Sequence, residues 1–350
     1  MRPATLTLSH LAQHHPRWLD AGIRLDRVPA PFWLAAQALA LWPAWLWMGR
    51  RLADGSDDPL GLLALAALAA LAWQQRAALR TAPRLGWLLL AGAATVAATL
   101  LRTGLGPLPA WPPLLASLLA VLAIACGLLA FLPRPALGAA ADAPLPGVPA
   151  LPVLGLAVLA LPLLSSLQFY AGYPLRVLTA ELSHWLLMPF FRVAREGASL
   201  WISGRLVIVD APCSGVQMVW LGYFTACATA LFFAHSDSRT FLTRLPVVSA
   251  LVLVGNVVRN ALLVAAEGAG RALPGWAHEA LGLAVLAAVC GGIAFFMARP
   301  ARTARHASNR KSGSGLIAWP PRRAHFATDA ATPPSSLITT PGARRVDTHA

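Results

Sequence analysis

Charged side chains are scarce in this sequence of 350 residues: they make up 12% of it, whereas hydrophobic residues make up 57%. Soluble domains usually carry about 25% charged residues, so this chain has too little polar surface to cover a water-exposed fold. Its apolar residues also come in runs of roughly 17 to 25, the length at which a helix crosses a hydrocarbon core about 30 Å thick. The composition therefore excludes a soluble protein and predicts a polytopic membrane protein.

Cysteine is also rare. The four cysteines, Cys126, Cys213, Cys227 and Cys290, lie far apart and show neither the spacing of a metal site nor that of a disulfide framework. Three of them lie well inside apolar runs, where a cysteine is ordinarily a small buried hydrophobe. Cys213 differs from the others because it stands at the boundary of a run.

Lysine is nearly absent, since Lys311 is the only one and arginine carries almost all of the formal charge of +14. The arginines occur in short clusters between apolar runs rather than on one basic domain. We therefore expect no nucleic-acid binding, and phosphate binding is a weaker alternative. Such clusters instead indicate orientation, because cytoplasmic loops carry the positive excess. Those before residue 31, at 76–84 and at 299–311 predict that both termini are cytoplasmic.

Eight apolar segments predict an all-α transmembrane helix bundle of about eight spans. They are residues 31–48, 60–75, 85–101, 112–132, 151–171, 214–234, 246–265 and 278–298. Residues 1–30 lack the short apolar core and cleavage site of a signal peptide. We therefore expect this segment to be cytoplasmic and the first span itself to direct insertion into the membrane. The rest divides into N-terminal membrane spans at 31–150, a second group of spans at 151–298, and a basic cytoplasmic tail at 299–350 whose composition predicts disorder.

One connection, between the fifth and sixth spans, is too long and too mixed to be a simple loop. In the segment 175–195, charged residues are mixed with apolar ones, as in an amphipathic or broken helix at the membrane face. Residues 200–210, LWISGRLVIVD, alternate around a Ser-Gly turn and predict a small hairpin. Both segments lie on the outer face in this topology.

Cys213, Arg259 and His278 should all approach the outer face, because the last three spans run inward, outward and inward again. Cys213 follows Pro212 at the start of the sixth span, and a helix N-terminus favours the nucleophilic thiolate. Arg259 lies late in the seventh span; a charge at mid-helix costs about 2.5–3.5 kcal/mol, so a functional site is the default interpretation. His278 opens the eighth span and could exchange protons near neutral pH.

Each of these residues also has a plainer interpretation. Cys213 could be a small interfacial residue that packs as a hydrophobe. Arg259 could extend toward the outer headgroups, helped by Asn256 and Asn260. His278 could be an ordinary polar residue at a helix end.

The motifs around these residues resemble those of the exosortase and archaeosortase family of membrane transpeptidases. CSG at 213–215 resembles the nucleophile motif, NVVRN at 256–260 the arginine motif, and HEALG at 278–282 the histidine motif, in the same order and at similar spacing. Two upstream stretches, beginning at Leu167 and Arg195, resemble the family's approach to the cysteine. The resemblance covers about residues 151–298 and makes this region the expected catalytic core. It implies three catalytic residues, Cys213, Arg259 and His278, and four supporting ones, Ser214, Gly215, Asn256 and Asn260.

The resemblance implies a cysteine-type peptidase and transpeptidase of the inner membrane, with its active site on the outer, periplasmic face. Besides membrane lipids, its partners would be exported proteins that carry a sorting signal of the PEP-CTERM kind, a short motif followed by one transmembrane helix and basic residues. Cys213 would form a thioacyl intermediate, Arg259 would stabilise the oxyanion and His278 would act as acid and base, without a metal or organic cofactor.

Two alternatives to this enzyme remain open from the sequence. One is a non-enzymatic component or transporter of exopolysaccharide export, in which Arg259 binds an anionic substrate. The other is a degenerate homologue that binds sorting signals without cutting them.

The distribution of arginine predicts that residues 172–213 face outward and that both termini face the cytoplasm. Topology reporters fused after Gly172 and after Arg299 should therefore report opposite sides of the membrane. The same side for both fusions would contradict the eight-span arrangement.

Overall fold

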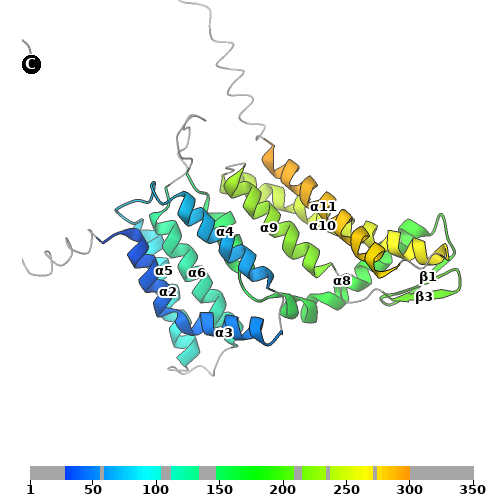
Figure 1. Ribbon diagram of the computed structural model, residues 1–350, viewed down its shortest axis with the longest axis horizontal. Coiled ribbons are helices and arrows are strands. Elements are labelled where there is room, and N and C mark those ends of the chain that lie inside the picture. Colours follow the sequence, from blue (N-terminus) through cyan, green and yellow to red (C-terminus); the bar gives the residue numbers. More distant parts are fainter. Residues whose placement is uncertain are drawn as a thin grey trace, which may run out of the picture. The chain divides into compact units, whose positions relative to one another are not determined.

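The computed structural model describes residues 28–55, 59–103, 112–133, 147–208, 215–233, 237–270 and 274–299. These residues are mostly helical, as the sequence predicts, and they include one small sheet (Figure 1). Cys213 and Ser214 lie outside the described residues, as do the N-terminal segment up to residue 27 and the tail beyond Arg299. The disorder expected for the tail therefore stays a prediction.

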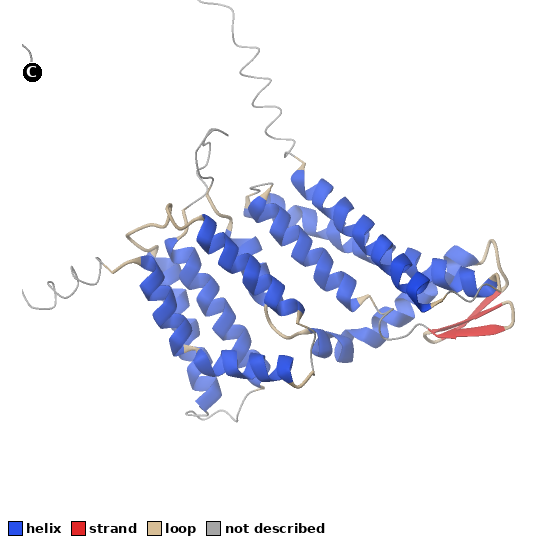
Figure 2. Cartoon of the chain, viewed as in Figure 1, coloured by secondary structure: helices blue, strands red, loops and turns tan. Residues whose placement is uncertain are grey.

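Ten helices are described, and Figure 2 shows how they dominate the structure. The N-terminal part of the chain forms α2 (Ala30–Ala40), α3 (Trp42–Ala53), α4 (Leu60–Gln74), α5 (Leu85–Thr103) and α6 (Pro113–Phe131). The C-terminal part forms α7 (Ala150–Leu159), α8 (Leu164–Leu187), α9 (Val216–Phe232), α10 (Ser238–Gly268) and α11 (Gly275–Ala298).

Four of these helices, α5, α6, α10 and α11, are long and apolar enough to cross a membrane. The bent pair of α7 and α8 makes a fifth candidate if it counts as one span, and α2, α4 and α9 are shorter apolar helices. At 1.5 Å per residue, α4 extends only about 22 Å, less than a hydrocarbon core of about 30 Å. By length and composition, the described residues thus contain four or five candidate spans rather than the eight expected.

Prolines accompany the breaks in two of the predicted spans. Leu41 separates α2 from α3 just before Pro43, and Pro162 lies in the break between α7 and α8, which are bent by 92°. Proline lacks the N–H that continues a helix, and its ring clashes with the preceding turn. The predicted span 151–171 is therefore not one straight helix: its second half belongs to α8, which continues to Leu187.

The buried core surrounds α7 and α9, which pack against each other. Trp220 of α9 is only 1% exposed, and its Nε1 donates a hydrogen bond to the carbonyl oxygen of Leu159 at 3.1 Å, satisfying a carbonyl at the end of α7. α9 also contacts α8, α10 and α11, while α6 connects α7 with the N-terminal helices. Large apolar side chains such as Leu39 and Leu89 remain exposed, as expected for residues that face lipid.

Three antiparallel strands, β1 (Val193–Glu196), β2 (Ser199–Ile202) and β3 (Arg205–Ile208), form a sheet in that order. The predicted hairpin is confirmed as β2 and β3. Ser203 and Gly204 join them with φ angles of 48° and 79°, as a type I′ turn requires. The sequence did not predict β1.

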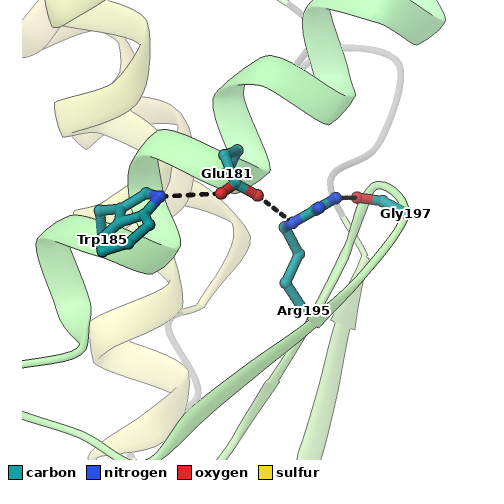
Figure 3. A network of polar contacts seen from close by, with 4 residues as sticks. All are labelled: Glu181, Trp185, Arg195 and Gly197. Atoms are coloured by element: carbon teal, nitrogen blue, oxygen red, sulfur yellow. Dashed lines mark hydrogen bonds and ion pairs between the residues drawn. The ribbon is translucent and has the colours of Figure 1, made fainter.

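A polar network links this sheet to α8 (Figure 3). Glu181 accepts a hydrogen bond from Trp185 Nε1 at 2.8 Å and forms an ion pair with Arg195 of β1. Arg195 Nη1 also donates to the carbonyl oxygen of Gly197 at 2.8 Å. Partly exposed ion pairs contribute only about 0–1 kcal/mol. The sheet is therefore held mainly by apolar contacts, such as that of buried Ile202 with α10.

Gly222 of α9 packs directly against α10, because a Cβ at this position would overlap Cγ2 of Val252. Gly222→Ala should therefore lower the free energy of unfolding by about 1–3 kcal/mol through overpacking. Gly291 of α11 is the matched control, since no described atom lies within 4 Å of the Cβ position. Gly291→Ala should leave stability unchanged or raise it by up to ~1 kcal/mol. Thermal unfolding in detergent compares the two variants, and equal midpoints would contradict the contact at Gly222.

Candidate active site

Arg259 lies in the second half of α10, in an otherwise largely apolar stretch, and is half-buried. Opposite it on α11 is Gly282, where a Cβ would lie 3.1 Å from both Nε and Nη2 of the guanidinium. This separation is tighter than an ordinary van der Waals contact, so glycine at position 282 leaves the room that the guanidinium occupies. The contact between α10 and α11 thus restricts where the charge of Arg259 can lie.

A cavity of about 310 Å³ opens beside this guanidinium, bounded by α9, α10 and α11. It is lined by Gln217, Met218, Leu221, Arg259, Glu279, Gly282, Leu283 and Leu286. Three of these side chains are polar or charged and the others are apolar, which suits a ligand with one polar group and an apolar remainder. A fixed guanidinium at this position can bind an anion or stabilise negative charge that develops during a reaction.

The first turn of α9 reaches the same cavity through Gln217. The N-cap of this helix, Gly215, has φ 83°, a left-handed conformation that favours glycine. A Cβ at Gly215 would also lie 2.7 Å from Cγ and from Nδ2 of Asn256, so the backbone passes close to that side chain. Asn256 precedes Arg259 by about one turn of α10. The start of α9 and the guanidinium of Arg259 therefore both lie at the same part of α10.

Asn256 and Asn260 are buried at the contact between α10 and α8. Asn256 Nδ2 donates a hydrogen bond to Thr179 Oγ1 at 2.9 Å, and Asn260 Nδ2 donates one to Ser183 Oγ at 2.9 Å. Both asparagines are supporting residues that the family resemblance implies, whereas no sequence motif indicates Thr179 or Ser183. Thr179 and Ser183 are four residues apart, and so are Asn256 and Asn260. This shared spacing is the sequence signal that could have connected the two sets, because residues four apart share one face of a helix.

His278 is exposed near the start of α11. It precedes Gly282 by four residues and therefore lies on the helix face that contacts Arg259, one turn away. Its neighbour Glu279, which is not among the predicted site residues, lines the cavity with Arg259. The structure thus brings Arg259, Glu279 and Gly282 together at the cavity, whereas His278, the residue before Glu279, is not among the described residues that line it.

Cys213 and Ser214 directly precede the N-cap of α9 in the sequence but are not described, so their predicted roles stay predictions. The described cysteines, Cys126, Cys227 and Cys290, lie in α6, α9 and α11 and form no disulfide. Among the described residues, no group of three His, Cys, Asp or Glu side chains is arranged to hold a metal ion.

Four helices long and apolar enough to cross a membrane define a multi-pass membrane protein, and Arg259 lines a partly polar cavity within its bundle. The chain belongs to the transmembrane exosortase family: it matches the family model described as Transmembrane exosortase (Exosortase_EpsH) over residues 45–295. This confirms the resemblance read from the motifs, and the matched region begins well before residue 151. No curated protein and no solved structure matches the chain. Membership of this family implies a transpeptidase that processes sorting signals.

Gly215→Ala should combine two unfavourable effects that a control can separate. Any alanine in the left-handed region costs roughly 1–2 kcal/mol, and at Gly215 a collision with Asn256 should add about 1–3 kcal/mol. Gly270 also has positive φ, at 71°, but no described atom lies within 4 Å of its Cβ position. We therefore expect Gly215→Ala to lower the thermal unfolding midpoint in detergent more than Gly270→Ala does. Indistinguishable midpoints would contradict the close approach of Gly215 to Asn256.

Proposed function

We propose that this exosortase is a cysteine-type peptidase and transpeptidase that cuts C-terminal sorting signals of the PEP-CTERM kind from exported proteins. One observation supports the proposal above the others: the cavity that contains Arg259 is also lined by the first turn of α9, the helix that Cys213 directly precedes. Stabilising an oxyanion requires a fixed donor group near the nucleophile, in a site with little water. The guanidinium of Arg259, in a partly apolar cavity beside this helix start, supplies such a donor.

In the proposed reaction, the thiolate of Cys213 attacks the carbonyl carbon of the scissile peptide bond. Arg259 donates hydrogen bonds to the oxyanion that forms. The C–N bond then breaks, leaving a thioester on Cys213, and His278 gives a proton to the leaving amine. An acceptor nucleophile next loses its proton to His278 and attacks the thioester, which releases the product and restores the thiolate.

The lining of the cavity supports a substrate that changes from polar to apolar along its length. Gln217, Glu279 and Arg259 provide the polar part, whereas Leu283 and Leu286 provide apolar surface further along α11. A sorting signal has this character, because its short motif is followed directly by a transmembrane helix. We place the scissile carbonyl at Arg259 and the first apolar residues of the substrate against α11.

We further propose about eight spans in the inner membrane, with both termini cytoplasmic and the active site on the periplasmic face. The four long apolar helices would be joined by α4, α9, the bent pair α7–α8 and the interrupted pair α2–α3. In the domain arrangement that follows, residues 1–30 and 299–350 are cytoplasmic, residues 31–150 form the N-terminal spans, and residues 151–298 form the catalytic core. Ser214, Gly215, Asn256 and Asn260 support the catalytic residues within this core.

An export component or transporter remains the second candidate, because a guanidinium in an intramembrane cavity also suits an anionic solute. The two functions differ in what they require of Cys213. Transport of an anion would depend on Arg259 and leave Cys213 dispensable, whereas transpeptidation depends on both.

We expect Cys213→Ser to accumulate the uncleaved precursor of a co-expressed sorting-signal protein, because a serine hydroxyl has no low-energy anionic form at neutral pH.

Arg259→Lys should reduce processing by about 10²- to 10³-fold, since lysine keeps the charge but loses the planar set of donors. His278→Ala should slow it by about 10²- to 10⁴-fold. Combining His278→Ala with Cys213→Ser should add little, because residues that act as one catalytic unit are not additive. The mass shift of the substrate on a gel measures each variant.

Cys290→Ser is the matched control, because it makes the same substitution at a partly buried cysteine of α11 that has no role in the proposed reaction. It should process the substrate at the wild-type rate. Normal processing by Cys213→Ser would exclude the transpeptidase mechanism and favour the transport function.

A further inference from the structure

Two hydroxyl–amide pairs are buried where α8 meets α10. Thr179 and Ser183 are 1% and 0% exposed, and Asn256 and Asn260 are each 4% exposed. Asn256 donates to Thr179 and Asn260 donates to Ser183, each across 2.9 Å. Ser183 Oγ additionally donates to the carbonyl oxygen of Val257 at 3.4 Å. We call the two side-chain pairs the α8–α10 polar pairs.

The α8–α10 polar pairs define one register of the two helices. On each helix the paired residues are four apart, and the pairing follows the same sequence direction, so α8 and α10 run parallel at this contact. Sliding α10 along α8 by one turn would keep at most one of the two pairs. Rotating α10 about its axis would break both pairs, because the two asparagines lie on one face of the helix and would turn away from α8 together.

In a membrane, van der Waals packing and interhelical hydrogen bonds together select the register of two helices. Lipid tails are as apolar as leucine, so helices gain little from burying leucine against each other, and interhelical hydrogen bonds between polar side chains become a main source of specificity. A single buried polar residue can also fix the register of paired helices in water. The polar pairs are therefore suited to setting the rotation of α10.

That rotation determines where the guanidinium points. Arg259 lies between the two asparagines in the sequence and about 60° around the helix from Asn256, so it faces α11 and the cavity when the asparagines face α8. Asn256 also lies against Gly215, where α9 begins. One arrangement of α10 thus sets both the direction of Arg259 and the place where α9 starts.

We propose that Thr179 and Ser183 are positioning residues for sorting-signal cleavage, which fix the rotation of α10 through Asn256 and Asn260 so that Arg259 faces the reacting carbonyl. This inference rests on the proposed transpeptidase function. Neither Thr179 nor Ser183 lines the described part of the cavity, so both act through α10 rather than on the substrate.

The first measurement is processing of a co-expressed sorting-signal protein, normalised to the amount of enzyme in the membrane. Thr179→Val and Ser183→Ala each remove one hydroxyl and should lower processing by about 10- to 100-fold, as expected for a catalytic group displaced by about 1 Å. Thr179→Ser keeps the hydroxyl and should restore most of the lost activity. Thr229→Val is the matched control: Thr229 is 5% exposed on α9, outside the polar pairs, and this variant should process like the wild type.

The second measurement is the pH dependence of Cys213 labelling by a membrane-impermeant maleimide, with Cys126, Cys227 and Cys290 replaced by alanine. In the proposed site, Arg259 favours the thiolate, so turning the guanidinium away should move half-maximal labelling to higher pH. Thr179→Val and Ser183→Ala should show this shift, whereas Thr229→Val should not. A residue needed only for folding would reduce the amount of labelled protein without moving the midpoint.

The positioning role is overturned if Thr179→Val and Ser183→Ala match Thr229→Val in both measurements, or if Thr179→Ser is as impaired as Thr179→Val. Should Thr179→Val fail to accumulate in the membrane, Ser183→Ala and Thr179→Ser carry the same comparison. Cleavage by Cys213→Ser would overturn the transpeptidase function itself. An inactive Cys213→Ser enzyme together with unimpaired Thr179 and Ser183 variants would overturn the positioning role alone.

Discussion

A guanidinium keeps its charge in proteins, and this constraint at Arg259 determines how the surrounding helices are built. Holding that charge within an apolar span costs about 2.5–3.5 kcal/mol at mid-helix, so the neighbouring helices must provide space and polarity. Gly282 gives the space on α11, and Gln217 and Glu279 add polar groups to the cavity. The same features that accommodate the charge also leave it accessible to a ligand.

A charge inside the bundle is useful only if its direction is fixed, and hydrogen bonds between helices add to packing in fixing it in lipid. The bend between α7 and α8 allows α8 to run along α10 instead of continuing the direction of α7. This course brings Thr179 and Ser183 to Asn256 and Asn260. The sheet then joins the far ends of both helices, since buried Ile202 contacts α8 and α10 through a shared apolar cluster.

Much of this architecture could be predicted from apolar runs and turn residues. The runs predicted where most helices lie, and the Ser-Gly sequence at 203–204 predicted the hairpin, because few sequences adopt two consecutive positive φ angles. The bend was missed because proline is tolerated in many transmembrane helices, so Pro162 alone does not distinguish a continuous span from a broken one. Arg259, by contrast, could be identified from the sequence, because the free-energy cost of a charge in an apolar run is high wherever the helix lies.

The residues that the sequence did not reveal are those whose function depends on a partner helix. A hydroxyl such as that of Thr179 ordinarily bonds to a carbonyl of its own helix, so its sequence gives no sign of an interhelical role. Glu279 points in a different direction from His278 on a helix and reads from the sequence as an ordinary charge at a helix N-terminus, yet the packing of α11 on Arg259 makes it the one of the two that lines the cavity. Contacts of this kind are set by helix rotation, which the apolar pattern of a membrane helix specifies only weakly.

Helices α3 to α6 contain no recognised catalytic motif, yet they fall within the region that matches the exosortase family. Their contacts provide a physical reason. Gly61 of α4 lies against the bend, where a Cβ would come within 2.6 Å of the carbonyl oxygen of Ala160, and α6 packs on α7. On the other side of α7, Trp220 of α9 holds the carbonyl of Leu159. The N-terminal helices therefore support the bend that directs α8 toward α10, and through it the arrangement on which the position of Arg259 depends.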